Sequence, residues 1–251
     1  MILVLVGFVV GVCVAYSGVG AGALTTPALL FMGFDASIAI GSDLLFSLGT
    51  KVSALVANFH RRAVDTRLLL ALSGGGVPGA VVGVLLNSWL HGRYEPHYLN
   101  HVLRVAVGCA LLVSAGVILF RRHNDESAPQ ERAALPTGWL ILVGFFVGLM
   151  VSLTSVGSGS LTLPLLLLIV PSMRLRPLVG TDIAFSVLML VPAILGHWRV
   201  GDVDARLSAQ LLVGAIPGTF VGAALATRLP GRLFRVFLAL VLCACGLVLI
   251  F

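Results

Sequence analysis

Two runs rich in glycine and hydroxyl residues are the parts of this chain whose backbone is best suited to bind a ligand. They are Ser17-Gly18-Val19-Gly20-Ala21-Gly22 and Thr154-Ser155-Val156-Gly157-Ser158-Gly159-Ser160. Glycine at this density ends a helix, and the short apolar piece after each run carries a proline near its start, where a helix tolerates it. Each run is therefore predicted to interrupt a helix.

Helices that restart near Leu24 and Leu161 would direct uncapped N–H groups and a partial positive charge at the interruptions. Two such helix N-termini that face each other form an anion site that needs no formal cation. The alternative is that the small residues serve only close helix packing. The residues predicted to bind the anion are Ser17, Gly18, Gly20, Gly22, Thr154, Ser155, Gly157, Ser158, Gly159 and Ser160.

Two aspartates lie inside apolar stretches, Asp43 after Gly-Ser and Asp182 after Gly-Thr. A charge at the centre of a membrane helix costs about 2.5–3.5 kcal/mol, and ionisable groups there mark ion pathways or proton relays. One interpretation is that both aspartates couple or balance charge, so that Asp43→Asn or Asp182→Asn stops gradient-driven flux in a folded protein. The other is that each caps a second broken helix.

Lys51 is the one lysine of the chain, and its counterpart in the second half is Leu190. It follows Asp43 by eight residues, about 80° around a helix, so a direct pair between them is not favoured. We expect Lys51 to attract an anion or to pair with a carboxylate of a neighbouring helix. His197, near the end of its helix, is expected at the membrane interface.

The composition indicates which class of protein must hold these residues. Of 251 residues, 59% are hydrophobic and only 10% are charged, whereas soluble domains carry about 25% charged residues. The chain is therefore predicted to be a polytopic membrane protein whose partners are the lipid bilayer and a small anion. Its net charge of +6 comes from basic residues that stand singly or in pairs, so no nucleic-acid partner is expected.

No enzyme activity and no cofactor are expected. The sequence contains no nucleophile–base–acid set, metal cluster or phosphate-binding loop, and its G-x-G runs lack the strand context of a dinucleotide site. The four cysteines lie in apolar segments without metal-ligand spacing, and we interpret them as small buried hydrophobes: Cys13, Cys109, Cys243 and Cys245.

The predicted fold is an all-α polytopic membrane protein. Its candidate helical segments are 2–17 plus 24–33, 37–59, 67–90, 98–120, 138–154 plus 161–170, 177–198, 207–228 and 233–251. They form two homologous repeats of four segments, and the first segment of each repeat is broken or re-entrant. The polar connector 121–136 separates a first transmembrane repeat, 1–120, from a second, 137–251.

The repeats follow from matched motifs. Gly20-x-Gly22-x-Leu24-Thr25-x-Pro27 matches Gly157-x-Gly159-x-Leu161-Thr162-x-Pro164, and Gly41-Ser42-Asp43 matches Gly180-Thr181-Asp182. Val64-Asp65-x-Arg67-Leu68 matches Val203-Asp204-x-Arg206-Leu207 in the same order. Chance similarity between apolar segments would not keep glycines, prolines and aspartates in register. Internal duplication of this kind is the common architecture of secondary transporters.

Two topologies fit these segments. If each broken helix crosses the membrane, eight crossings result and the arginines divide eight to seven between the two sides. If each is a re-entrant hairpin, six crossings and inverted repeats result, and the arginines divide eleven to four, as the positive-inside rule prefers. We therefore favour inverted repeats with both termini outside the cytoplasm.

The order of these motifs resembles the sulfite exporter TauE/SafE family of membrane permeases. The resemblance rests on S-G-V-G-A-G, L-T-T-P, G-S-D and G-T-D, V-D-x-R-L and P-G-x-x-x-G, and it covers nearly the whole chain. It implies a transporter of small sulfur-containing anions such as sulfite or sulfoacetate in the bacterial cytoplasmic membrane.

The function expected from the sequence is a multi-pass secondary transporter in the cytoplasmic (inner) membrane for a sulfur oxyanion or an organosulfonate. One alternative is a carrier or channel for another small solute, such as a carboxylate. The other is a non-transporting membrane assembly factor, which would tolerate bulky side chains at Gly20 or Gly157. The oligomeric state is left open.

Overall fold

The computed structural model describes residues 1–17, 20–57, 64–120, 137–170, 173, 175–226 and 231–251, and every regular element within them is a helix. The predicted all-helical architecture is therefore confirmed, while the connector 121–136 lies outside the described residues. The helices, in chain order, are α1 (Ile2–Ser17), α2 (Gly22–Phe31), α3 (Ala36–Ala57), α4 (Thr66–Arg93), α5 (Pro96–Phe120), α6 (Thr137–Thr154), α7 (Thr162–Ile169), α8 (Leu175–Val200), α9 (Ala205–Ala226) and α10 (Gly231–Ile250).

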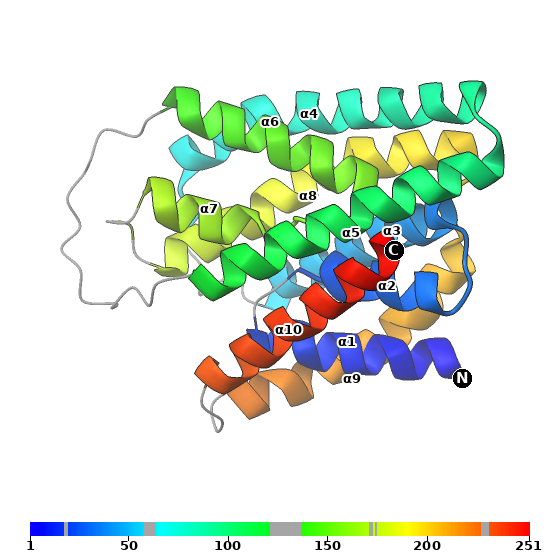
Figure 1. The fold of residues 1–251 in the computed structure, drawn as a ribbon. Helices are drawn as coiled ribbons and strands as arrows, with labels where there is room; N and C mark the ends of the chain where they lie inside the picture. The colour runs from blue at the N-terminus through cyan, green and yellow to red at the C-terminus, as the bar shows by residue number, and fades with distance from the viewer. Residues whose placement is uncertain (18–19, 58–63, 121–136, 171–172, 174, 227–230) are drawn as a thin grey trace.

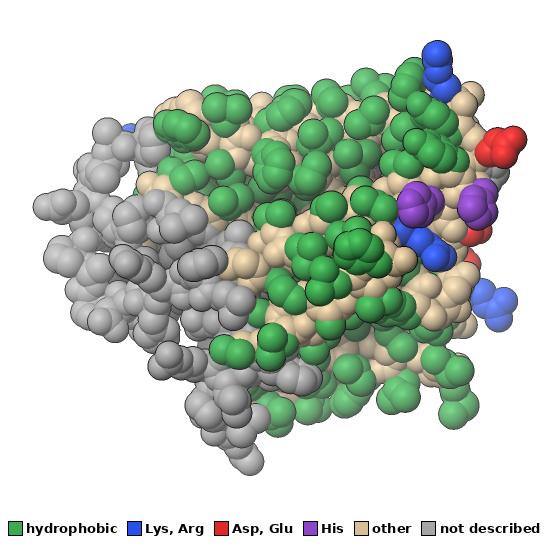
Figure 2. Space-filling view, in the orientation of Figure 1, with side chains coloured by type: hydrophobic (Ala, Val, Ile, Leu, Met, Phe, Trp, Pro, Cys, Tyr) green, Lys and Arg blue, Asp and Glu red, His purple; other side chains and the backbone are tan. Residues whose placement is uncertain are grey.

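The surface of the helices is suited to lipid. In the described part of the chain, stretches of α4, α5, α6, α8 and α9 are long and apolar enough to cross a membrane. Hydrophobic side chains cover most of the face seen in Figure 2, while charged and histidine side chains gather near the turn from α4 to α5. Exposed Trp89, Tyr94 and Tyr98 lie at that same turn, where aromatic residues mark a membrane–water interface. The chain is a membrane protein.

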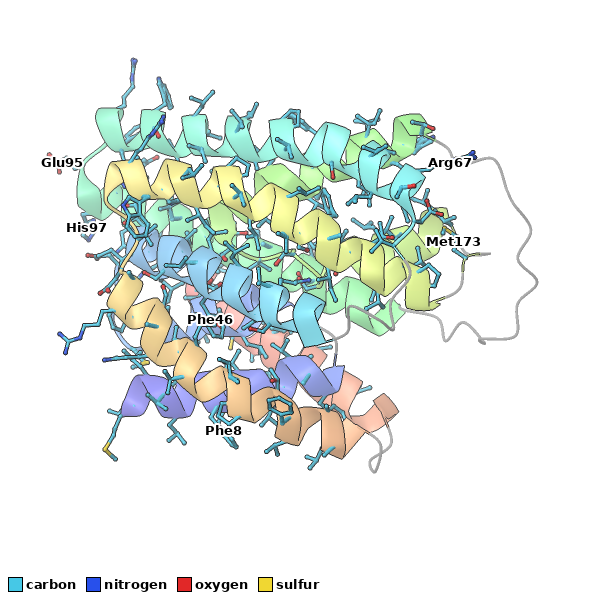
Figure 3. All side chains as sticks on the ribbon, turned by 180° about the vertical axis from the view of Figure 1, so that it is seen from behind. Phe8, Phe46, Arg67, Glu95, His97 and Met173 are labelled. Atoms are coloured by element: carbon cyan, nitrogen blue, oxygen red, sulfur yellow. The ribbon has the colours of Figure 1, made fainter. Side chains whose placement is uncertain are left out.

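The molecule has two ends, which we name after two residues that lie there. Figure 3 places Arg67 and Met173 at one end, the Arg67 end, and Glu95 and His97 at the other, the Glu95 end. Helices α3, α5 and α9 run from the Glu95 end towards the Arg67 end, and α4, α8 and α10 run the opposite way (Figure 1).

The interrupted helices turn back on themselves. Helix α1 starts at the Glu95 end, and α2 leads back towards it, where the Ala36 N–H donates to Asn100 Oδ1 over 2.8 Å. Helix α6 starts at the Arg67 end, and α7 leads back towards it (Figure 1). Each pair of helices therefore enters and leaves the molecule at the same end.

Glycines let two parallel helix pairs pack with their backbones in contact. A Cβ on Gly7 or Gly218 would overlap backbone carbonyls across the α1–α9 interface, at Leu211 and Phe8. The α4–α6 interface has the same character: a Cβ on Gly144 would overlap the Leu72 carbonyl. Small residues are what such close approach requires in a membrane.

Helices α3 and α8 pack together in the interior. A hydrogen bond joins α3 to the start of α9, and another joins α8 to the start of α4. Asp65 caps α4 by accepting hydrogen bonds from two backbone N–H groups, and its own N–H donates to Thr181 Oγ1 of α8 over 3.0 Å. Asp204 accepts equivalent bonds at the start of α9, and its N–H donates to Ser42 Oγ of α3 over 2.9 Å. Both aspartates therefore begin their helices as N-cap residues.

Candidate functional site

Both predicted interruptions are present. Helix α1 ends at Ser17 and α2 begins at Gly22, while α6 ends at Thr154 and α7 begins at Thr162. Gly157 and Gly159 have φ values of 131° and 114°, which glycine adopts without strain. The chain leaves α6 at Ser155, whose φ is 57°, and Gly157 and Gly159 then allow the backbone to turn before α7 begins.

The two interruptions touch one another through their backbones. A Cβ on Gly20 would overlap the carbonyl oxygen of Ser158, and a Cβ on Gly22 would overlap that of Ser155. Gly159 lies on the same contact, since its Cβ would stand 3.1 Å from the Gly20 nitrogen. Segments more than 130 residues apart in the sequence thus meet inside the protein, where their residues are buried.

Neither restarting helix is capped by a side chain of its N-cap residue, which is Ala21 for α2 and Leu161 for α7. The partial positive charge at each helix N-terminus is therefore directed into the region where the interruptions meet. This is the element that an anion site at the interruptions requires.

The predicted hydroxyl donors have different surroundings. Thr154 donates to the Met150 carbonyl over 2.7 Å and accepts from the Val156 N–H, so it stabilises the end of α6. Ser160 Oγ lies 3.3 Å from Ser114 Oγ on α5. The Ser158 hydroxyl is buried without a hydrogen-bond partner. Gly18 lies outside the described residues, and Ser17 is the last residue of α1.

The capping interpretation of Asp43 and Asp182 is wrong. Both residues lie in the interior of unbroken helices, α3 and α8, where every backbone N–H already has a helical partner. Asp43 is fully buried, and its Oδ2 accepts a hydrogen bond of 2.7 Å from Thr26 of α2.

Lys51 pairs with Asp182 and not with Asp43. Its Nζ lies 3.1 Å from Asp182 Oδ2, and the two side chains are 13% and 6% exposed. The same ammonium lies 3.3 Å from the position of a Cβ on Gly159, so the cation stands at the edge of the second interruption. A buried cation beside two helix N-termini can hold an anion by charge as well as by hydrogen bonds.

Two further hydroxyls belong to this region, and the sequence interpretation did not single them out. Ser47 and Ser186 are buried without hydrogen-bond partners, one helical turn after Asp43 and Asp182. The signal was available, because Phe46-Ser47 and Phe185-Ser186 occupy matching places in the two halves. Unpaired buried hydroxyls are costly unless something binds them.

His197 lies in the last turn of α8, as the sequence indicated, and its side chain is 1% exposed, so it faces the protein interior. Its Nε2 lies 2.8 Å from the carbonyl oxygen of Ser152, in the last turn of α6, where helix carbonyls lack a helical partner. A buried histidine is tolerated here because its Nε2–H donates a hydrogen bond to a buried carbonyl oxygen.

Known proteins match the chain over its whole length. The family model described as Sulfite exporter TauE/SafE matches residues 3–249. The chain is 32% identical over 255 residues to the probable membrane transporter protein YjnA of Bacillus subtilis (strain 168), covering 99% of this chain and 98% of that protein. It is 27% identical to the probable membrane transporter protein YdhB of the same organism, with 100% of both chains covered. The probable membrane transporter protein MJ0441 of Methanocaldococcus jannaschii is 22% identical, covering 98% of this chain and 93% of that protein.

Proposed function

Because the chain belongs to the sulfite exporter TauE/SafE family, we propose that it is a multi-pass secondary transporter of the cytoplasmic membrane that moves a small anion. The substrate class is a sulfur oxyanion or an organosulfonate, such as sulfite or sulfoacetate. The observation that carries this proposal is the Lys51–Asp182 ion pair at the contact between the two interrupted helices.

The proposed architecture is a pair of inverted repeats, 1–120 and 137–251, joined by the connector 121–136. Matched contacts support it: the Asp65–Thr181 bond recurs as Asp204–Ser42 after exchange of the two halves. Helices α5 and α10 also cross through matching glycines. A Cβ on Gly108 would lie 2.8 Å from the Gly246 carbonyl oxygen, and a Cβ on Gly246 would lie 2.9 Å from the Gly108 carbonyl oxygen. Such symmetry supports a substrate site between the repeats.

The proposed topology is six crossings with α1–α2 and α6–α7 as re-entrant hairpins and with the Arg67 end in the cytoplasm. The positive-inside bias supports this orientation. The arginines assigned to the cytoplasmic side are Arg61, Arg62, Arg67, Arg121, Arg122, Arg132, Arg174, Arg176, Arg228, Arg232 and Arg235. Those on the other side are Arg93, Arg104, Arg199 and Arg206.

A reporter fused after Phe251 tests this topology. We expect a periplasm-active reporter such as alkaline phosphatase to be active there, and a cytoplasm-active reporter to be silent, because α10 runs towards the Glu95 end. The matched control is the same pair of reporters inserted in the connector 121–136, where the activities should be reversed. A cytoplasmic C-terminus would rule the topology out.

In the proposed site, the anion binds where the Lys51 ammonium, the Ser158 hydroxyl and the starts of α2 and α7 converge. Lys51 already has a counter-ion in Asp182, so an incoming anion competes with that carboxylate for the ammonium. A carboxylate that loses its cation in a buried position is costly to keep ionised. Binding of the anion therefore displaces the counter-ion of Asp182, and in the proposed mechanism Asp182 and Asp43 couple or balance charge during transport.

Flux measured with purified protein in liposomes tests the function. We expect uptake of sulfite or sulfoacetate above that of protein-free liposomes, with a stimulation by an inward proton gradient. Thiosulfate and taurine define the range of sulfur compounds, and acetate represents the carboxylates. Faster flux of acetate than of any sulfur anion would favour the carrier of another solute. A folded protein that carries none of these solutes would favour the assembly-factor alternative.

A further inference from the structure

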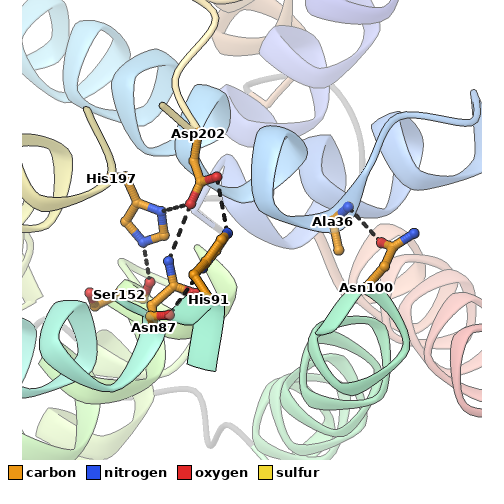
Figure 4. Close-up of polar contacts among 7 residues, drawn as sticks. All are labelled: Ala36, Asn87, His91, Asn100, Ser152, His197 and Asp202. Atoms are coloured by element: carbon orange, nitrogen blue, oxygen red, sulfur yellow. Dashed lines mark hydrogen bonds and ion pairs between the residues drawn. The ribbon is translucent and has the colours of Figure 1, made fainter. Parts of the chain in front are cut away.

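A second polar cluster lies at the Glu95 end and joins α4, α8 and the link between α8 and α9 (Figure 4). Its centre is Asp202. The two oxygens of this carboxylate face different imidazoles: Oδ1 lies 3.3 Å from His91 Nε2, and Oδ2 lies 3.4 Å from His197 Nδ1. Asn87 Nδ2 also donates to Oδ2 over 3.2 Å. One carboxylate thus holds two histidines from different helices.

The other nitrogen of each imidazole fixes the tautomer. His91 Nδ1 lies 3.0 Å from the Asn87 carbonyl oxygen, and His197 Nε2 lies 2.8 Å from the Ser152 carbonyl oxygen. A carbonyl only accepts hydrogen bonds, so each of these nitrogens must carry a hydrogen. A neutral imidazole has only one N–H, and therefore the nitrogens that face Asp202 would be bare. Each of these nitrogens therefore attracts the carboxylate only when it carries an additional proton.

The carboxylate of Asp202 is the partner that both imidazoles share. Burial by itself raises the pKa of Asp202, but the contact with His197, the charges of His91 and His197 and the Asn87 amide outweigh it and hold the pKa below its usual value. Asp202 is therefore a carboxylate at neutral pH. The stability that the ionised carboxylate itself contributes is present above the ordinary carboxyl pKa and is lost as the pH falls through the lowered native value.

We propose that His91, Asp202 and His197 form a proton-binding site, in which imidazolium–carboxylate contacts hold the Glu95 ends of α4 and α8 together and release of the protons loosens them. His91 is the entry, because its side chain is 23% exposed, while those of Asp202 and His197 are 7% and 1% exposed. Ser152, the carbonyl partner of His197, lies two residues before Thr154, where α6 ends at the second interruption.

Few other charges act on this cluster from the described elements around it. Helix α6 carries no titratable side chain between Thr137 and Thr154, and α3 meets Asp202 through Gly41. Asp204 uses its carboxylate to cap α9. Among the remaining charged and histidine side chains at this end, Arg104 of α5 is half-buried and the others are exposed: Asp35, Arg93, Glu95, His97, His101, Arg199 and Arg206. None of these described side chains forms an ion pair with a residue of the site.

Histidine NMR with ring-15N label tests proton binding directly. In detergent-solubilised protein titrated from about pH 5 to pH 8, we expect His91 and His197 to titrate as a coupled pair. The two signals are assigned among the six histidines with His91→Gln and His197→Gln. Asp202→Asn, which keeps the size of the side chain and removes its charge, should abolish the coupling. The matched control is Asp35→Asn, an aspartate of the same end, which should leave both signals unchanged.

Hydrogen exchange of the segment 152–160 gives the second readout. After correction for the intrinsic pH dependence, we expect exchange in the wild type to accelerate about 5-fold or more as the histidines lose their protons, and to become pH-independent in Asp202→Asn. Should Asp202→Asn fail to fold, His91→Gln serves in its place. The proposal is overturned if the histidines titrate alike in the wild type and in Asp202→Asn. It is also overturned if hydrogen exchange of the segment 152–160 does not depend on pH in the wild type. Neither readout involves sulfite or flux, so its failure leaves the proposed transport function standing.

Discussion

Replacing Lys51 with methionine is expected to abolish gradient-driven anion flux and to lower the free energy of unfolding by about 3 kcal/mol. Methionine keeps the length of the side chain but leaves Asp182 buried without a cation, and removal of one partner of a buried ion pair costs about 3–5 kcal/mol. The lower figure applies because Lys51 is 13% exposed. Flux is measured in liposomes, and unfolding by thermal denaturation in detergent.

Second variants separate the loss of stability from the loss of transport. Lys51→Met combined with Asp182→Asn removes both charges, so stability should return while flux does not, because the cation for the anion is still missing. Asp43→Asn is the matched control for the charge change at Asp182. Because Asp43 contacts Thr26 rather than a cation, we expect its replacement to cause little loss of stability. It should still stop coupled flux, since both aspartates are proposed to couple or balance charge. Lys51→Met protein with wild-type flux would contradict the proposed site.

The sequence predicts those features that depend on local pattern. The interruptions at Gly20 and Gly157 follow from glycine and proline placement, and both are present. The caps at Asp65 and Asp204 are equally local, because an aspartate two residues before an arginine at the start of an apolar run needs only its own helix to act. Such features require no knowledge of which helices are neighbours.

Contacts between helices could not be predicted from a single sequence. Lys51 could be expected to find a carboxylate on another helix, but the choice of Asp182 depends on how α3 and α8 are placed side by side. The partners of His197 could not be predicted for the same reason, since they come from α6 and from the link before α9. Different environments of the two aspartates could have been suspected, because the counterpart of Thr26 is Leu163 and that of Lys51 is Leu190.

Replacing Gly20 with alanine is expected to reduce flux about 5- to 150-fold while the protein remains helical by circular dichroism. The added Cβ would overlap the Ser158 carbonyl, and this contact joins backbone to backbone, so no flexible side chain can move aside. Overpacking of this kind costs about 1–3 kcal/mol. This cost lowers the population of the state in which the interruptions meet by about 5- to 150-fold. Flux in liposomes and helix content measured on the same preparation check the prediction.

Gly74→Ala in α4 is the matched control, because no atom lies within 4 Å of a Cβ at that position. It should keep wild-type flux and gain slightly in stability, since alanine favours a helix interior over glycine. Gly22→Ala provides an independent repeat, as its Cβ would overlap the carbonyl of Ser155. If Gly20→Ala and Gly22→Ala both transport at the wild-type rate, direct contact between the interrupted helices is not needed for transport. The anion would then have to bind elsewhere, and the small residues at the interruptions would serve only the packing of the helices.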